Sequence, residues 1–294
     1  MHLLKQYERP ILIVILGALW GINFPVSKFA LSYFDPYSFR AITSLLALIP
    51  YAALVAPTVN RKFVVRQADV GSLLLIAIPL FVIVPLFNLI SLDFIHSSQA
   101  IILIYTMPAL SSLFYMVQSK DFNLLGFVPM LFCLAGCVLV IQGSGSFSLG
   151  HIIILTGAIV WAYGGRMYDR TTITTDIRVG AFIQLAFASI FNIGLVVLLL
   201  SLGNSVQIPK ISAPVVLVTI YVGIFGNGIA FIIWYFLMVR FGSKYAAYSM
   251  MAAPPIGVWT STLVNGEPLV FPVILGLTFM VISMLANHLS AQSR

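Results

Sequence analysis

Long apolar stretches with almost no charge recur along nearly the whole chain, and they constrain its fold more than any other feature. A helix needs about 20 mostly apolar residues to cross the hydrocarbon core of a bilayer. Ten windows meet this condition: residues 10–30, 36–56, 70–92, 98–118, 123–142, 149–168, 179–202, 213–238, 245–264 and 268–289. Since a membrane-crossing segment must satisfy its backbone hydrogen bonds internally, each window predicts a helix. The expected fold is an all-α polytopic membrane protein with ten transmembrane helices.

The composition leaves too few charged residues to cover a water-exposed surface. Of the 294 residues, 61% are hydrophobic and 8% are charged, whereas about a quarter of a soluble domain is charged. The net charge of +7 could suggest nucleic acid, but the cations are not clustered on a soluble reading surface. We therefore expect the lipid bilayer, and no nucleic acid, as a partner.

The basic residues give these windows an orientation. With the N-terminus inside, twelve Lys and Arg residues fall on the cytoplasmic side, and only Lys28, Arg40 and Lys210 fall outside. This bias is typical of proteins that follow the positive-inside rule. It predicts a multi-pass protein of the inner (plasma) membrane with both termini in the cytoplasm. We expect a monomer, with a dimer as the alternative.

The chain also matches itself. Residues 92–110 align with residues 239–257 at an offset of 147, which places Pro108 on Pro255. Near the start of each half the offset is 141, and Trp20 falls on Trp161. The sequence therefore divides into a first half, residues 1–143, and a second half, residues 144–294, with five windows each.

An odd number of windows in each half means that the second half enters the membrane upside down. Charges at two matched positions exchange sign accordingly: Asp93 matches Arg240, and Lys120 matches Glu267. Lys28, outside, against Asp169, inside, is the exception. Inverted repeats are typical of secondary transporters, whose substrate site lies near the midplane between the repeats. We expect Pro108 and Pro254-Pro255 to break or bend their helices, and Gly17 and Gly21 to form a packing face.

Three stretches resemble a known family. "ALWGINFPVSKFAL" and "AIVWAYGGRMYDR" resemble the openings of the two halves of EamA-type members of the drug/metabolite transporter superfamily. The stretch from "FIIWYFLMVRFGSKYAAY" to "PPIGVWTSTLVNGEPLVFPVILG" resembles the closing pattern of the family. The resemblance implies two inverted five-helix repeats around a central cavity, and transport of small metabolites, often export of amino acids. The first half departs from the pattern, because Lys120 stands where the family has a Gly-Glu glutamate. This indicates that the Gly-Glu element is a turn device.

The candidate substrate-binding residues are the polar and aromatic residues in the windows that the resemblance directs toward the cavity. They are Trp20, Asn23, Phe24, Asn88, Gln99, Tyr105, Trp161, Tyr163, Asn227, Trp234 and Tyr248. An interhelical hydrogen bond is the alternative role for Asn23. Core packing or an interfacial belt is the alternative for each aromatic residue.

Two cations at the outer ends of windows are candidates to contact a substrate carboxylate. Arg40 and Lys28 have this position. The alternative for Arg40 is a cation that snorkels to the outer surface and pairs with Asp35. Because the windows contain almost no charge at the midplane, they favour neutral or zwitterionic cargo over polyanions.

The function expected from these patterns is export of small neutral or zwitterionic metabolites by alternating access, with aromatic or hydrophobic amino acids as the first choice. A passive channel is the alternative. A membrane-embedded enzyme is disfavoured, because the four histidines are scattered near helix ends and no catalytic motif is present. Cys133 and Cys137 alone do not make a metal site, so we expect neither a metal nor a cofactor.

Overall fold

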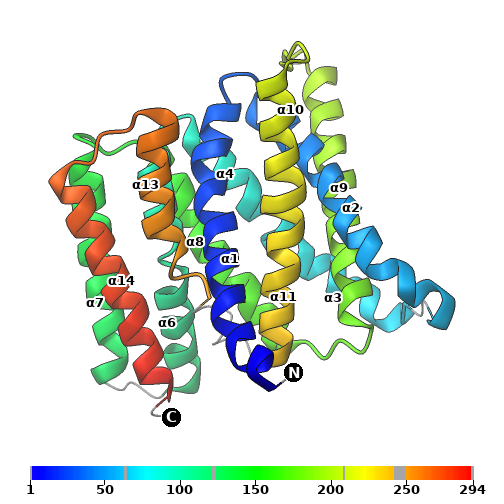
Figure 1. The fold of residues 1–294 in the computed structure, drawn as a ribbon, viewed down its shortest axis with the longest axis horizontal. Helices are drawn as coiled ribbons and strands as arrows, with labels where there is room; N and C mark the ends of the chain where they lie inside the picture. The colour runs from blue at the N-terminus through cyan, green and yellow to red at the C-terminus, as the bar shows by residue number, and fades with distance from the viewer. Residues whose placement is uncertain (1, 63–64, 121–123, 208, 242–248, 293–294) are drawn as a thin grey trace.

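The computed structural model describes residues 2–62, 65–120, 124–207, 209–241 and 249–292, whose regular structure is helical (Figure 1). The elements are α1 (His2–Ala30), α2 (Pro36–Lys62), α3 (Gln67–Ala77), η1 (Ile78–Ile83), α4 (Val84–Leu92), α5 (Ser97–Ile104), α6 (Met107–Ser119), α7 (Leu124–Gly143), α8 (Leu149–Arg170), α9 (Ile177–Ser201), α10 (Ala213–Ile220), η2 (Tyr221–Ile229), α11 (Ala230–Phe241), α13 (Ala253–Asn265) and α14 (Phe271–Gln292).

Several of these helices are long and apolar enough to cross a membrane. Among the described residues, six stretches qualify: Ile11–Ala30, Pro36–Ala56, Gln67–Leu92, Ser97–Ser119, Ile177–Ser201 and Ala213–Leu237. Phe127–Gly143 and Phe271–Ala286 are shorter apolar helices. The described part of the chain is therefore an all-helical, polytopic membrane protein, as its apolar windows predict.

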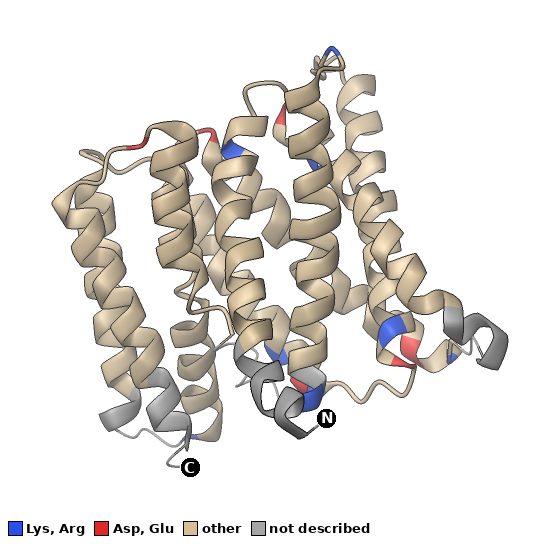
Figure 2. Cartoon of the chain, viewed as in Figure 1, with Lys and Arg blue, Asp and Glu red and all other residues tan. Residues whose placement is uncertain are grey.

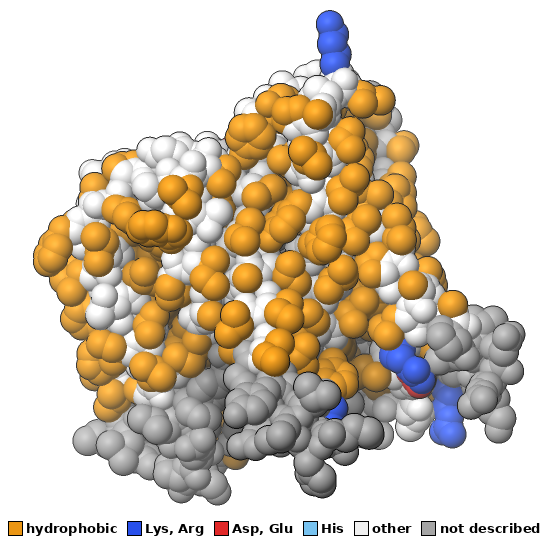
Figure 3. Space-filling model, in the orientation of Figure 1, with side chains coloured by type: hydrophobic (Ala, Val, Ile, Leu, Met, Phe, Trp, Pro, Cys, Tyr) orange, Lys and Arg blue, Asp and Glu red, His pale blue; other side chains and the backbone are white. Residues whose placement is uncertain are grey.

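The helices run side by side between two ends of the molecule, called here the upper and lower ends as in Figure 1. Helix α1 begins and α14 ends at the lower end, whereas α1 ends and α2 begins at the upper end. The α7–α14 pair lies on one side of the bundle and the α2–α9 pair on the other, and α1 packs on α13 between them. Charged residues gather near the two ends (Figure 2). Hydrophobic side chains cover much of the face between them (Figure 3), as a lipid-facing surface requires.

Two of the long helices contain a π-helical segment in the middle. In η1 the N–H of Val84 bonds to the carbonyl of Pro79, and in η2 the N–H of Ala230 bonds to the carbonyl of Phe225. Each bond spans five residues instead of four, so one extra residue is fitted into the turn. Such wide turns are frequent at functional sites, and both segments border the pocket described below.

Prolines start helices here, so that of the two expected effects, a break or a bend, the structure shows a break. Pro254 and Pro255 lie in the first turn of α13, and residues 249–252 before them form turns. They therefore begin a helix instead of bending one at its centre, because the first helical turn needs no N–H from these positions. Pro108 likewise lies in the first turn of α6, after a break at Tyr105 and Thr106.

The contact between α1 and α13 is close because of small residues. A Cβ at Gly17 would lie 2.5 Å from the Cβ of Ala252, and one at Gly21 would lie 2.9 Å from the carbonyl oxygen of Ala253. Small residues let two helix backbones approach in this way. The packing face predicted at Gly17 and Gly21 is confirmed.

Candidate functional site

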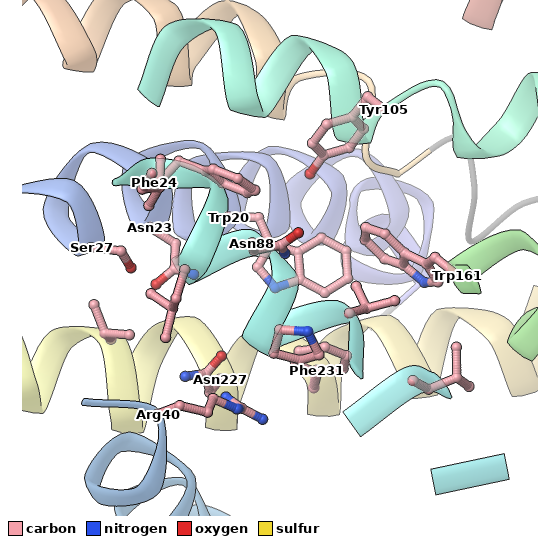
Figure 4. Close-up of a pocket in the computed structure, with 16 residues that line it drawn as sticks. Trp20, Asn23, Phe24, Ser27, Arg40, Asn88, Tyr105, Trp161, Asn227 and Phe231 are labelled. Carbon is pink, nitrogen blue, oxygen red and sulfur yellow. The ribbon is translucent and has the colours of Figure 1, made fainter. Parts of the chain in front are cut away.

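A pocket lies inside the bundle, between helices from both halves of the chain (Figure 4). It encloses about 660 Å³ of space not occupied by atoms, its open part included. The lining residues are Trp20, Asn23, Phe24, Ser27, Arg40, Leu80, Val84, Pro85, Asn88, Leu89, Leu92, Tyr105, Trp161, Val222, Asn227 and Phe231. This mixture of apolar walls and a few polar groups is typical of small-molecule sites.

Aromatic rings form the lower part of the pocket. The ring of Trp20 lies 5.9 Å from that of Trp161 and 5.2 Å from that of Phe231, both in edge-to-face contact. The indole Nε1 of Trp20 donates to the carbonyl of Gly226 at 3.2 Å, which fixes the orientation of the ring. Phe231 also contacts Phe81, 5.4 Å away, and Phe81 stacks on Tyr235 at 6.1 Å. These contacts join the rings of the pocket to those behind them in one aromatic cluster.

Asparagine side chains supply the uncharged polar groups. Among the described residues, the Oδ1 atoms of Asn23 and Asn88 are buried and have no hydrogen-bond donor. Asn23 owes its position to Gly226, since a Cβ there would lie 2.2 Å from the Asn23 Oδ1. Unpaired buried acceptors are costly, so these two atoms favour a ligand that donates hydrogen bonds.

Arg40 is the cation of the pocket, and its place differs from the snorkelling position considered for it. Its side chain is only 2% exposed. Its Nη2 donates to the carbonyl of Phe81 at 2.8 Å. That carbonyl lacks its regular α-helical donor because residue 85 is a proline.

The expected partner of Arg40 is occupied elsewhere. Asp35 accepts hydrogen bonds from the backbone N–H groups of Tyr37, Ser38 and Gln207 and from the Ser38 hydroxyl. The predicted pairing of Arg40 with Asp35 is therefore wrong, because Asp35 caps the N-terminus of α2 and binds the loop before α10. Arg40 faces inward from α2 instead.

The other predicted residues lie at various distances from this pocket. Gln99 and Trp234 are buried but do not line it, although the Trp234 ring lies 6.3 Å from that of Trp20. Tyr163 is 57% exposed, because two residues along α8 from Trp161 the side chain points to the opposite face. Lys28 donates to the carbonyl of Leu92. Tyr248 lies outside the described residues.

The pocket also contains residues that the sequence did not single out. Ser27 and Phe231 are one helical turn from Asn23 and Asn227, respectively, so helical spacing alone could have identified both. The apolar members were missed because nothing distinguishes them from lipid-facing residues. They are Leu80, Val84, Pro85, Leu89, Leu92 and Val222.

A buried carboxylate joins the two halves of the chain at the upper end, an arrangement called here the upper clamp. Glu267 is 4% exposed and faces the first two residues of α5. Its Oε1 accepts from the N–H of Ser97 at 2.8 Å and from its hydroxyl at 2.6 Å, and its Oε2 accepts from the N–H and hydroxyl of Ser98 at 2.9 and 2.6 Å. A helix N-terminus stabilises an anion. The Gly-Glu element thus forms both a turn and a clamp.

A second carboxylate, the lower clamp, has the same number of donors at the other end. Asp69, in the first turn of α3, is 6% exposed. Its Oδ2 accepts from the N–H and hydroxyl of Thr174 at 3.0 and 2.9 Å, and from those of Thr175 at 2.7 and 2.8 Å. This clamp attaches α3 to the segment before α9.

The described residues offer no group of three His, Cys, Asp or Glu side chains that could hold a metal ion. Cys133 and Cys137 are buried free thiols on α7.

Comparisons with known proteins agree with this architecture. Residues 9–142 match the model of the EamA-like transporter family. The chain is 24% identical over 301 residues to "Uncharacterized transporter YvbV" of Bacillus subtilis (strain 168), which covers 97% of this chain and 92% of that protein. It is also 24% identical over 253 residues to "Uncharacterized transporter YdeK" of the same organism, covering 83% and 84% of the two chains. A solved structure described as "Crystal structure of protein" has the same fold, with a TM-score of 0.65, 19% identity, and coverage of 96% of this chain and 97% of that one.

Proposed function

We propose that this chain is a transporter of the EamA family within the drug/metabolite transporter superfamily, and that it exports small neutral or zwitterionic metabolites by alternating access. Amino acids with aromatic or hydrophobic side chains are the proposed cargo. The observation that carries this proposal is the ring-lined pocket with unpartnered amide oxygens.

Each part of such a cargo has a matching surface in the pocket. A flat or branched apolar group fits among Trp20, Trp161 and Phe231, where edge-to-face contacts add to the burial of apolar area. An ammonium group can donate to the free Oδ1 atoms of Asn23 and Asn88. In the pocket the apolar group gains contacts with the aromatic rings, and the ammonium group supplies the hydrogen-bond donors that the two amide oxygens lack.

Matched features in the two halves support the proposed inverted repeats, residues 1–143 and 144–294, with five membrane helices each. Both halves hold a π-helical segment, η1 and η2, in the third of their predicted windows. A helix that begins beside Pro108 in one half and Pro255 in the other ends at a left-handed residue, Lys120 with φ 54° and Gly266 with φ 65°.

Helices α7 and α14 meet at two glycines, one from each half of the chain. A Cβ at Gly136 would lie 3.0 Å from the carbonyl oxygen of Gly276, and one at Gly276 would lie 2.9 Å from that of Gly136. Glycines at this crossing let the two helix backbones approach closely.

The charges of the described residues favour a cytoplasmic lower end in the inner (plasma) membrane, with both termini on that side. Helices and the residues that flank them carry cations at that end, namely Arg66, Lys120, Arg166, Arg170, Arg178 and Arg240. The upper end carries Lys28, Arg40 and Lys210. Such a bias predicts orientation. We propose that the transporter acts as a monomer, with no cofactor.

Transport into proteoliposomes tests the function. We expect uptake of radiolabelled phenylalanine and leucine that accelerates when the same amino acid is loaded inside, because a carrier exchanges substrate faster than it returns empty. Adenosine and glucose serve as unrelated solutes. Flux without trans-stimulation would indicate a channel, and absence of flux for every amino acid would refute the proposed cargo.

A tryptophan pair shows whether the pocket is the site. Trp161→Ala removes a pocket ring and is expected to lower phenylalanine uptake about tenfold or more. Trp259→Ala makes the same change on α13, where the side chain is 62% exposed, and is expected to leave uptake near that of the parent. Equal effects of the two substitutions would remove the pocket from the proposal.

A further inference from the structure

Arg40 carries a buried positive charge that no carboxylate neutralises among the described residues. Its Nη2 bonds to the neutral carbonyl of Phe81, and its Nε has no hydrogen-bond partner. Asp35, the acidic residue nearest to it in the sequence, is held by other donors. The guanidinium therefore keeps its charge and unused donors while it lines the pocket.

An arrangement of this kind is costly without a ligand. A charge deep in a membrane protein costs several kcal/mol unless it is paired, and one carbonyl supplies a hydrogen bond but no opposite charge. The planar guanidinium matches a carboxylate in geometry and sign. A single cation balances one carboxylate, whereas a doubly charged phosphate would leave one charge unmatched.

We propose that Arg40 binds the carboxylate of the cargo and thereby restricts the pocket to small organic acids with an apolar or aromatic group, α-amino acids among them. In Figure 4, Arg40 lies next to Asn227, whereas Tyr105 and Trp161 lie on the far side of the pocket. The cargo is thus held with its acid group at Arg40 and its ring among the indoles. This inference rests on the proposed function and defines its substrate class.

Four compounds that each contain one phenyl ring test whether the pocket recognises the carboxylate of its cargo. Phenylalanine and 3-phenylpropionate carry a carboxylate, whereas phenylalaninamide and phenethylamine do not. Flux of each into proteoliposomes is measured together with the thermal stabilisation of the purified protein by each compound. The second readout reports binding even where transport is absent.

The informative variant is Arg40→Gln, because it removes the charge and keeps a polar amide at the position of Nε, although its shorter side chain gives up the bond from Nη2 to the Phe81 carbonyl. Arg40→Lys keeps the charge without the planar fork. Lys210→Gln makes the same change of charge at an exposed residue of the upper end and serves as the control.

We expect the parent to prefer the two carboxylates, and Arg40→Gln to reduce their flux and stabilisation roughly 10- to 100-fold. Phenylalaninamide and phenethylamine should change little, Arg40→Lys should be intermediate, and Lys210→Gln should match the parent. If the two carboxylates stabilise the parent protein but not Arg40→Gln, and the parent shows no flux, the inference holds and the transport proposal fails. An equal loss for all four compounds in Arg40→Gln, or a parent that does not distinguish acids from amides, would overturn the inference.

Discussion

The upper and lower clamps use the same kinds of donor, two N–H groups and two hydroxyls from consecutive residues. They differ in how the four hydrogen bonds are distributed over the two carboxylate oxygens. Glu267 divides its four hydrogen bonds between Oε1 and Oε2. Asp69 receives all four on Oδ2. The upper clamp therefore uses both oxygens of the carboxylate as acceptors. The lower clamp requires only one oxygen, which an amide can also supply.

The largest effect is expected from Glu267→Gln. The new NH₂ group would face the backbone N–H of one serine, donor against donor, in a site that is 4% exposed, while the serine hydroxyl beside it would have to turn and accept. We expect a loss of about 2–4 kcal/mol in the free energy of unfolding in detergent, since buried donors to a charged group lose their acceptor. Asp93→Asn, at an exposed carboxylate of the same end, is the control. A change within about 0.5 kcal/mol for Glu267→Gln would contradict the two-oxygen requirement.

A smaller effect is expected when single hydroxyls are removed from the upper clamp. Ser98→Ala loses one bond to Oε2 and should cost about 1 kcal/mol. Ser97→Ala should cost more, because its Oγ also accepts from Asn265 at 3.1 Å and lies 2.9 Å from the Ser261 hydroxyl. The free energies of unfolding of both variants, measured in the same detergent, give the order. The reverse order would show that these extra contacts do not contribute.

The smallest effect is expected from Asp69→Asn. The amide can present its oxygen to Thr174 and Thr175 in place of Oδ2, so the unfolding midpoint should stay within the scatter of the parent. Asp69→Ala, which removes the acceptor altogether, should lower the midpoint clearly. If Asp69→Asn were as damaging as Glu267→Gln, the negative charge itself, rather than the number of oxygens in use, would determine both clamps.

The sequence predicts the helices well because a membrane-crossing helix is built from a continuous run of apolar residues. Apolar windows of sufficient length locate the long helices, and the small residues at Gly17 and Gly21 predict close packing. The pocket residues Trp20, Asn23 and Asn227 could be proposed because polar and aromatic residues stand out within apolar helices.

Contacts between distant segments could not be predicted in the same way. The role of Glu267 depends on its loop lying against the start of α5, and that of Asp69 on the segment before α9. The depth of Arg40 depends on the carbonyl of Phe81. Pro85 indicates that one backbone carbonyl in its helix lacks an α-helical hydrogen bond. Only the packing of α2 against α4 brings Arg40 to that carbonyl. Helical phase likewise separates Trp161 from Tyr163.

The π-helical segments mark the places where the long helices that contain them tolerate the loss of a residue. The wide turn of η1 holds one extra residue, so a deletion there would close it to a regular α-helix and keep the parts on either side nearly in phase. A deletion in the regular helix α4 ahead of Asn88 would instead rotate those parts by about 100° relative to each other. Asn88 and Leu80, which now share one wall, would then face different directions, so the effect of one lost codon depends on which turn it falls in.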